Sequence, residues 1–115
     1  MKIGIIGAGK VGCSIGKYLK KHDFSVAGYC SKSKKSVEEA ATFTNTKAYD
    51  SLAELVAEST ILFLTTPDGA LESVWNELKK ESIQNKIVCH FSGSLSSDLF
   101  SNREEYGVSA ASFHP

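Results

Sequence analysis

Short apolar runs alternate with helical patterns along this chain. The runs are bounded by polar residues and glycine, and several are rich in β-branched residues, which is typical of buried strands. Strands that alternate with helices indicate a parallel sheet covered on both faces, and right-handed crossovers favour the strand order 3-2-1-4-5-6. We therefore predict a doubly wound α/β fold with six strands, at Lys2–Ile6, Ser25–Cys30, Lys47–Tyr49, Thr60–Thr65, Lys86–Phe91 and Val108–Phe113.

Helical patterns separate these strands. The apolar residues Val11, Ile15 and Leu19 recur every four positions, so they fall on one face of the first helix. Two Ser-x-x-Glu stretches fit capping boxes and predict where the next two helices begin. A proline marks the expected first residue of the fourth helix, and a further pattern follows the fifth strand. In chain order these features are Ser36–Glu39, Ser51–Glu54, Pro67 and Leu95–Glu105.

A glycine-rich turn, "GAGKVG", follows the first strand. Its residues Gly7, Gly9 and Gly12 have the spacing G-x-G-x-x-G. In such a turn the first glycine permits a tight bend, the second lets the backbone approach a pyrophosphate, and the third lets the helix pack on the strand. The backbone N–H groups at the positive end of the helix then hold the anion. The turn therefore predicts a dinucleotide site, and the alternative is a tight turn that binds nothing.

The end of the second strand distinguishes between the two nicotinamide dinucleotides. A protein that prefers NAD usually carries Asp or Glu there, to hold the ribose 2′-hydroxyl. This chain reads "GYCSKSKKS", in which Ser31, Lys32 and Ser33 can contact a 2′-phosphate. We therefore predict NADP, with NAD as the alternative cofactor. A solvated basic loop without a ligand is the other interpretation of these lysines.

Another loop at the same edge of the sheet follows the fourth strand. Thr65, Thr66 and Pro67 offer hydroxyl and backbone groups to a pyrophosphate or a nicotinamide ribose. The other interpretation is that Thr66 only caps the next helix. The two interpretations are compatible, because a capped helix can also border a ligand.

The loop after the fifth strand contains the candidate catalytic residues. Ser92 and Gly93 are expected near the nicotinamide ring, at the carboxyl end of that strand. Ser92 and, less directly, His90 could orient a carbonyl group or relay a proton during hydride transfer. The alternative for His90 is a buried, hydrogen-bonded histidine of the core.

Composition narrows the class of protein further. The 115 residues suit one domain, and a net charge of zero argues against a nucleic-acid surface. We expect a cytoplasmic protein away from membranes, because we find neither a signal peptide nor an apolar run of about 18 residues. The cysteines show no metal-binding spacing, so we expect no metal site. The chain stops at "ASFHP", directly after a predicted strand, which suggests the N-terminal part of a longer protein.

Five segments together resemble a known family: "IGIIGAGKVG", "GYCSKS", "LTTPDGAL", "HFSGSLSSDLF" and "SFHP". They are similar to the N-terminal Rossmann-like, NAD(P)-binding domain of oxidoreductases related to pyrroline-5-carboxylate reductase and to the 6-phosphogluconate and 3-hydroxyisobutyrate dehydrogenases. The resemblance covers essentially residues 1–115. It implies hydride transfer between NADP or NAD and a small imine, ketone or hydroxy acid. It also implies a C-terminal helical domain, outside these residues, that forms a homodimer and completes the active site.

The same resemblance implies a role for each matching residue. Hydride transfer is inferred only by analogy with the family. The second hypothesis is a regulatory module that senses a dinucleotide without turnover, since the sequence shows no strong acid–base pair. By the resemblance, the pyrophosphate would be held by Gly7, Ala8, Gly9, Lys10 and Val11, the adenosine ribose phosphate by Ser31 and Lys32, the nicotinamide ribose by Thr65, Thr66 and Pro67, and the ring by Ser92 and Gly93.

Overall fold

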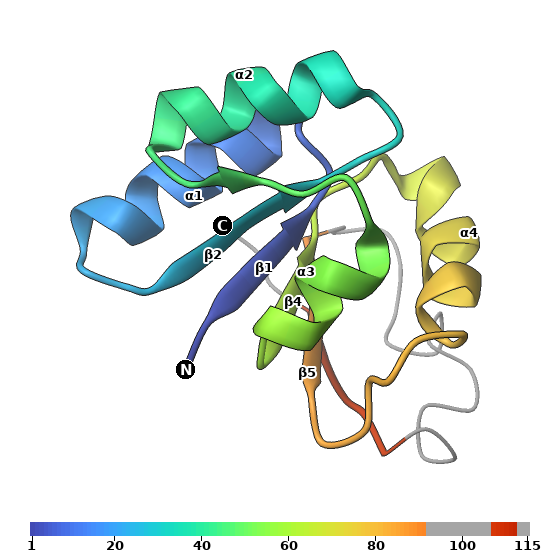
Figure 1. Cartoon of the computed structure of the whole chain (residues 1–115). Coiled ribbons are helices and arrows are strands. Elements are labelled where there is room, and N and C mark those ends of the chain that lie inside the picture. The colour runs from blue at the N-terminus through green and yellow to red at the C-terminus, as the bar shows by residue number, and fades with distance from the viewer. Residues whose placement is uncertain (92–106, 113–115) are drawn as a thin grey trace.

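A six-stranded parallel sheet lies between two layers of helices in the computed structural model, which describes residues 1–91 and 107–112 (Figure 1). The strand order is β3-β2-β1-β4-β5-β6, so the predicted fold class and topology are confirmed. Each predicted strand is present, and β1 to β5 are one or two residues shorter than expected. In chain order the elements are β1 (Ile3–Ile6), α1 (Lys10–Lys21), β2 (Val26–Cys30), α2 (Lys34–Thr44), β3 (Lys47–Ala48), α3 (Leu52–Glu58), β4 (Ile61–Leu64), α4 (Asp68–Leu78), β5 (Ile87–His90) and β6 (Ser109–Ser112).

The helices α1 and α2 cover one face of the sheet, over its β1–β3 half. Ile5 of β1 and Tyr29 of β2 are fully buried beneath this layer, against Leu19 of α1. The Tyr29 hydroxyl donates a hydrogen bond of 2.7 Å to the carbonyl oxygen of Gly12. A side chain at Gly16 would overlap that hydroxyl, so the glycine lets α1 pack directly on Tyr29.

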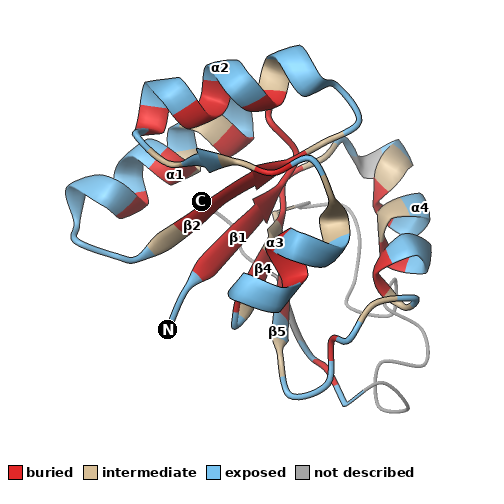
Figure 2. Cartoon of the chain, in the orientation of Figure 1, coloured by how far each residue is buried: buried red, intermediate tan, exposed pale blue. Residues whose placement is uncertain are grey.

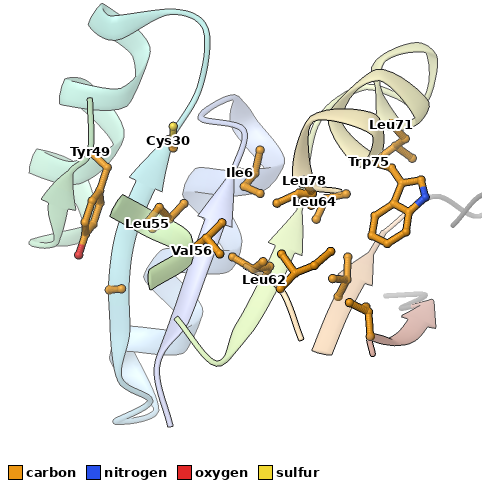
Figure 3. Close-up of a cluster of buried hydrophobic side chains, with 14 residues drawn as sticks. Ile6, Cys30, Tyr49, Leu55, Val56, Leu62, Leu64, Leu71, Trp75 and Leu78 are labelled. Atoms are coloured by element: carbon orange, nitrogen blue, oxygen red, sulfur yellow. The ribbon is translucent and has the colours of Figure 1, made fainter. Parts of the chain in front are cut away.

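The helices α3 and α4 cover the opposite face and bury the larger hydrophobic cluster (Figure 3). Trp75 and Leu78 of α4 are buried over β4 and β5, as the apolar spacing of this helix leads one to expect. Figure 2 shows that buried residues follow the strands and the inner sides of the helices. The helix expected at 95–105 lies outside the described residues.

The apolar face predicted for α1 is only partly buried. The helix buries Gly12, Gly16 and Leu19, whereas Val11 is 51% exposed and Ile15 is half-buried. The apolar stripe of α1 is therefore rotated, so that its small residues meet β1 and β2 and its larger ones point along the sheet toward β4.

Two of the predicted helix starts need correction. Ser51 does cap α3, since its hydroxyl accepts the N–H of Glu54 at 3.3 Å. However, α2 begins before the predicted capping box, because Ser33 is its N-cap and accepts the N–H of Ser36 at 3.3 Å. Pro67 is the N-cap of α4 rather than its first helical residue. Thr66 is therefore not the cap of that helix.

The buried Tyr29 makes a pH-dependent contribution to stability. Burial raises the pKa of Tyr29 from 10.0 to about 12. Its contribution is therefore complete below pH 10 and is lost as the pH rises from about 10 to 12, because the unfolded chain ionises first. We expect Tyr29→Phe to cost about 1 kcal/mol at pH 8, through the lost hydrogen bond, and to flatten the decline above pH 10.

Urea unfolding at pH 8 and pH 11 measures both effects. Tyr18→Phe is the matched control, because Tyr18 on α1 is 60% exposed, and this variant should follow the unmodified protein at both pH values. Parallel declines for Tyr29→Phe and the unmodified protein would contradict the assignment.

Candidate functional site

The three glycines of the turn between β1 and α1 differ in whether the fold leaves room for a side chain. Gly7 has a φ of +112°, and a Cβ there would lie 2.8 Å from the Thr65 hydroxyl oxygen. A Cβ on Gly12 would overlap the carbonyl oxygen of Gly7. A Cβ on Gly9 would have no atom of the described chain within 4 Å, and Gly9 has an ordinary φ of −82°. The fold itself therefore requires Gly7 and Gly12, but not Gly9.

The N-terminus of α1 opens onto the space beside Gly9. Gly9 is the N-cap and provides no side-chain cap, and the first turn carries no acidic residue. Helix geometry leaves the first N–H groups without intrahelical acceptors, and the helix dipole adds positive potential there. This end of α1 thus offers backbone donors to an anion, with the exposed Lys10 beside them.

A cleft of about 410 Å³ lies over the turn, where β1 and β4 are neighbours in the sheet. This is the switch point at which the strand order reverses, the expected ligand site of such folds. The structure brings together here most of the residues expected from the sequence. The described lining is Gly7, Ala8, Gly9, Lys10, Val11, Ser31, Ser36, Leu64, Thr65, Thr66, Pro67 and Phe91.

The two threonines after β4 have different environments. The Thr65 hydroxyl lies 3.2 Å from the carbonyl oxygen of Ile6 and 3.0 Å from that of Gly7, so it ties the end of β4 to the glycine turn. The Thr66 hydroxyl oxygen is buried and has no hydrogen-bond partner among the described residues. Thr66 is thus the threonine whose side chain retains hydrogen-bonding capacity at the cleft.

A second, smaller pocket of about 250 Å³ adjoins the cleft. The two share Ser31 and Thr66, so they form one continuous path across the carboxyl edge of the sheet. Leu52 and Val74 give the second pocket apolar walls, and Lys32 lies at its lining. An apolar slot beside a polar cleft can hold a flat ring next to its charged substituents.

The three residues predicted to meet a 2′-phosphate occupy different positions. Ser31 lines both pockets and Lys32 lines the second one. The Ser33 hydroxyl caps α2, by accepting the N–H of Ser36 and bonding its hydroxyl at 3.0 Å. Lys34 lies 3.9 Å from the Asp50 carboxylate, in an exposed pair.

The candidate catalytic residues lie only in part within the described chain. Ser92 and Gly93 lie outside the described residues. His90 is fully buried in β5 and is not among the described residues that line either pocket. Strand alternation places it on the same face as Val88, which belongs to the cluster beneath α3 and α4. The structure therefore does not bring the His90 imidazole to the described cleft.

The cysteines pack as small apolar residues. Cys30 and Cys89 are buried and Cys13 is half-buried, and all three are free thiols. Burial, with a smaller contribution from the Glu39 carboxylate, raises the pKa of the Cys13 thiol, although it lies at the start of α1. Within residues 1–91 and 107–112, no cluster of metal-ligating side chains is found, and no helix has the length and apolarity to cross a membrane.

Some lining residues were not predicted from the sequence. Phe91 lines the cleft, directly after β5, and its ring packs edge-to-face on Phe63 with 5.2 Å between centroids. Its place at the carboxyl end of a predicted strand was a usable signal. Leu52 and Val74 were also missed, because only the folded topology brings α3 and α4 to the same pocket.

Comparisons with known proteins agree with this architecture. The model of a family described as a Rossmann-like domain matches residues 1–115. A search of curated protein sequences found no match. One similar solved structure is 3-hydroxyisobutyrate dehydrogenase from Mycobacterium tuberculosis, with a TM-score of 0.80 and 16% identity over 95% of this chain and 38% of that one. Another is an imine reductase from Myxococcus stipitatus in complex with NADP+, with a TM-score of 0.78 and 17% identity over 96% of this chain and 40% of that one. A third is UDP-N-acetylglucosamine 3-dehydrogenase from Acidithiobacillus ferrooxidans, with a TM-score of 0.78 and 19% identity over 97% of this chain and 37% of that one.

The sequence identities and the covered lengths decide what these structural similarities show. At 16–19% identity they show a shared fold. The chain spans only 37–40% of the length of those three structures. The Rossmann-like domain expected from the sequence is confirmed, and the three solved structures named above that share its fold are oxidoreductases.

Proposed function

The chain belongs to the Rossmann-like domain family, and from that premise we propose that it binds NADP(H) as the cofactor domain of an oxidoreductase. The observation that carries the proposal is the open position beside Gly9, at a helix start that offers free backbone donors. A glycine that the fold does not need fits a backbone that must approach a ligand closely. A bound nicotinamide dinucleotide supplies or accepts a hydride, and the protein holds and orients it.

The residues of the two pockets fit the parts of such a dinucleotide. The backbone of Gly9, Lys10 and Val11 would hold the pyrophosphate, and the unpaired Thr66 hydroxyl would accept or donate a hydrogen bond at the adjoining ribose. The apolar slot between Leu52 and Val74 would hold the adenine ring. This division leaves the Phe91 end of the cleft for the nicotinamide.

The preference for NADP follows from the residues after β2. Among the described residues, no acidic side chain lines the first cleft, and Glu77 is the acidic residue that lines the second pocket. Ser31 lines both pockets and Lys32 lines the second one. A phosphate dianion is bound well by hydroxyl and ammonium donors. We place Ser31 and Lys32 at the 2′-phosphate, with Ser33 contributing through the N-terminus of the helix that it caps.

The proposed enzyme is longer than these residues. The solved structures named above are more than twice as long as this chain. By the family resemblance, we propose that the rest of the protein is a C-terminal helical domain that forms a homodimer and brings the substrate, a small imine, ketone or hydroxy acid. Free thiols fit a reducing compartment, and we place the enzyme in the cytoplasm.

The proton donor for the reaction is the part that the described cleft does not provide. Among its described lining residues, Lys10 is the one with an ionisable side chain. We therefore propose that Ser92 or a residue of the second domain supplies the acid–base group. The same observation favours the second candidate function, a module that senses the dinucleotide without turnover. Oxidation of NADPH by the full-length protein with small imines, ketones or 2-oxo acids separates the two.

Titration calorimetry with NADPH and NADH tests the cofactor assignment. We expect NADPH to bind at least about tenfold more tightly, because charge-assisted hydrogen bonds to the 2′-phosphate contribute about 1.5–3 kcal/mol. Lys32→Ala should remove most of this difference while leaving the affinity for NADH unchanged.

Lys35→Ala is the matched control for that titration. Lys35 lies in the same basic segment but lines neither the cleft nor its neighbour, so the NADPH preference should persist. Equal affinities of the unmodified protein for the two cofactors would overturn the NADP assignment. Binding of neither would overturn the proposed function.

A further inference from the structure

The second pocket contains an acidic residue that the proposed cofactor contacts do not use. Residues at helical spacing on α4 form one wall of this pocket, which has a volume of about 250 Å³. Along the wall, Ala70 and Val74 are half-buried, whereas Ser73 and Glu77 are exposed. The wall is therefore apolar in its depth and polar at its rim.

Charged side chains of opposite sign line the same pocket. Lys32 comes from the loop after β2 and Glu77 comes from α4, and the two make no ion pair with each other. Neither side chain makes a hydrogen bond or a salt bridge with any other described residue. Both charges therefore remain available to a ligand that occupies the pocket.

The Glu77 carboxylate acts on the interior of the pocket. Cys30, at the end of β2, is buried and lines the pocket as well. Burial is the main reason that the pKa of the Cys30 thiol is raised; the backbone of Ser31 lowers this pKa, and the carboxylates of Glu77 and Asp50 raise it further. Because such charge effects weaken with distance, the Glu77 carboxylate is part of the pocket and not of a remote helix face.

The adenosine end of NADP(H) carries the complementary pattern. Its 2′-phosphate is an anion, and the 6-amino group of its adenine ring is a hydrogen-bond donor. The proposed function places the phosphate at Lys32 and the ring between Leu52 and Val74. With the ring in that slot, its amino group needs an acceptor, and Glu77 is the carboxylate that the pocket offers among its described residues.

We propose that Glu77 selects the adenine base of the dinucleotide, by accepting a hydrogen bond from its 6-amino group. The inference rests on the proposed function, which assigns this pocket to the adenosine end of NADP(H). An ionised carboxylate has acceptor sites only. It therefore binds the amino group of adenine and repels the carbonyl oxygen that hypoxanthine and guanine carry at the same ring position.

The ribose 2′-hydroxyl is the other group that a carboxylate of this pocket could hold. In NAD-binding proteins an acidic residue at the end of the second strand usually does so. This chain has Ser31 and Lys32 at that position, and Glu77 lies on α4. The two contacts predict different results, because the amino group is common to NADH and NADPH, whereas the 2′-hydroxyl is free in NADH alone.

Titration calorimetry with NADPH, NADH and the hypoxanthine analogue of NADPH tests the proposal. In the analogue a carbonyl oxygen replaces the 6-amino group. We expect NADPH to bind at least about tenfold more tightly than the analogue, because a site built to pair with a polar group rejects a ligand that lacks it. Glu77→Gln should remove most of this difference, since an amide both accepts and donates, and should weaken NADPH and NADH by the same factor.

Glu72→Gln is the matched control for this titration. Glu72 is exposed on the same helix and lines neither the cleft nor the second pocket, so the preference for NADPH over the analogue should persist. Both variants should keep the thermal midpoint of the unmodified protein, because both positions are exposed.

The possible results separate this inference from the proposed function. Equal affinities of the unmodified protein for NADPH and its hypoxanthine analogue would overturn the inference and leave the proposed function in place. So would an undiminished preference for NADPH over the analogue in Glu77→Gln. A loss of affinity for NADH alone in that variant would also overturn it, since the carboxylate would then hold the ribose 2′-hydroxyl. Binding of none of the three dinucleotides would overturn the proposed function itself.

Discussion

Gly9→Ala should weaken NADPH binding by about tenfold to a hundredfold and leave the stability of the protein unchanged. A Cβ at this position meets no described atom within 4 Å, and its φ of −82° is open to any residue, so the folded chain accommodates alanine. The new methyl group would occupy the space over the turn that the pyrophosphate needs. Forcing a methyl group into a packed contact costs about 1–3 kcal/mol, and each 1.4 kcal/mol is tenfold in affinity.

Gly69→Ala is the matched control for this variant. Gly69 lies in the first turn of α4, its Cβ would also meet no described atom within 4 Å, and it is outside the described lining of both pockets. Its NADPH affinity should be unchanged, and its thermal midpoint should stay level or rise, because alanine favours a helix over glycine by up to about 1 kcal/mol. Unchanged NADPH binding by Gly9→Ala, measured by calorimetry, would mean that no ligand approaches the turn closely.

The fold could be predicted from the sequence because its signals are local and repeated. Each strand is a short apolar run, and right-handed crossovers together with the dinucleotide-binding pattern favour the strand order that the structure has. The errors arose where local signals compete. Ser33 and Ser36 are both good caps, and the structure uses Ser33. On α1, Gly12 and Gly16 allow the close approach to Tyr29, whereas Val11, on the predicted apolar face, is exposed.

The part of the candidate site that one continuous segment forms could be predicted from the sequence. The part that several separate segments form together could not. The glycine turn is contiguous in sequence, so its spacing and context identify it from the sequence alone. The spacing did not reveal that Gly9 differs from Gly7 and Gly12, because that difference depends on atoms of Thr65 and of the turn itself. The second pocket needs α3 and α4 together, and no sequence pattern joins Leu52 to Val74.

Trp75→Ala should lower the free energy of unfolding by about 3–5 kcal/mol, the largest stability change among the variants considered. Trp75 is 1% exposed and lies with Leu71 and Leu78 of α4 over β4 and β5 (Figure 3). Truncation removes most of a large aromatic side chain and leaves a cavity that the rigid sheet cannot fill. For a domain of this size the thermal midpoint should fall by about 10 °C or more.

The comparison with Phe43→Ala shows whether burial causes this loss. Phe43 is 54% exposed on α2, so its removal should change the unfolding free energy by less than about 1 kcal/mol. Trp75 lines neither pocket, and its folded variant should still bind NADPH with nearly the original affinity at 10 °C. A strong loss of affinity would show instead that α4 must be held rigidly by this core for Thr66, just ahead of the helix, to reach the dinucleotide. A loss of stability no larger than that of Phe43→Ala would contradict the packing of α4 itself.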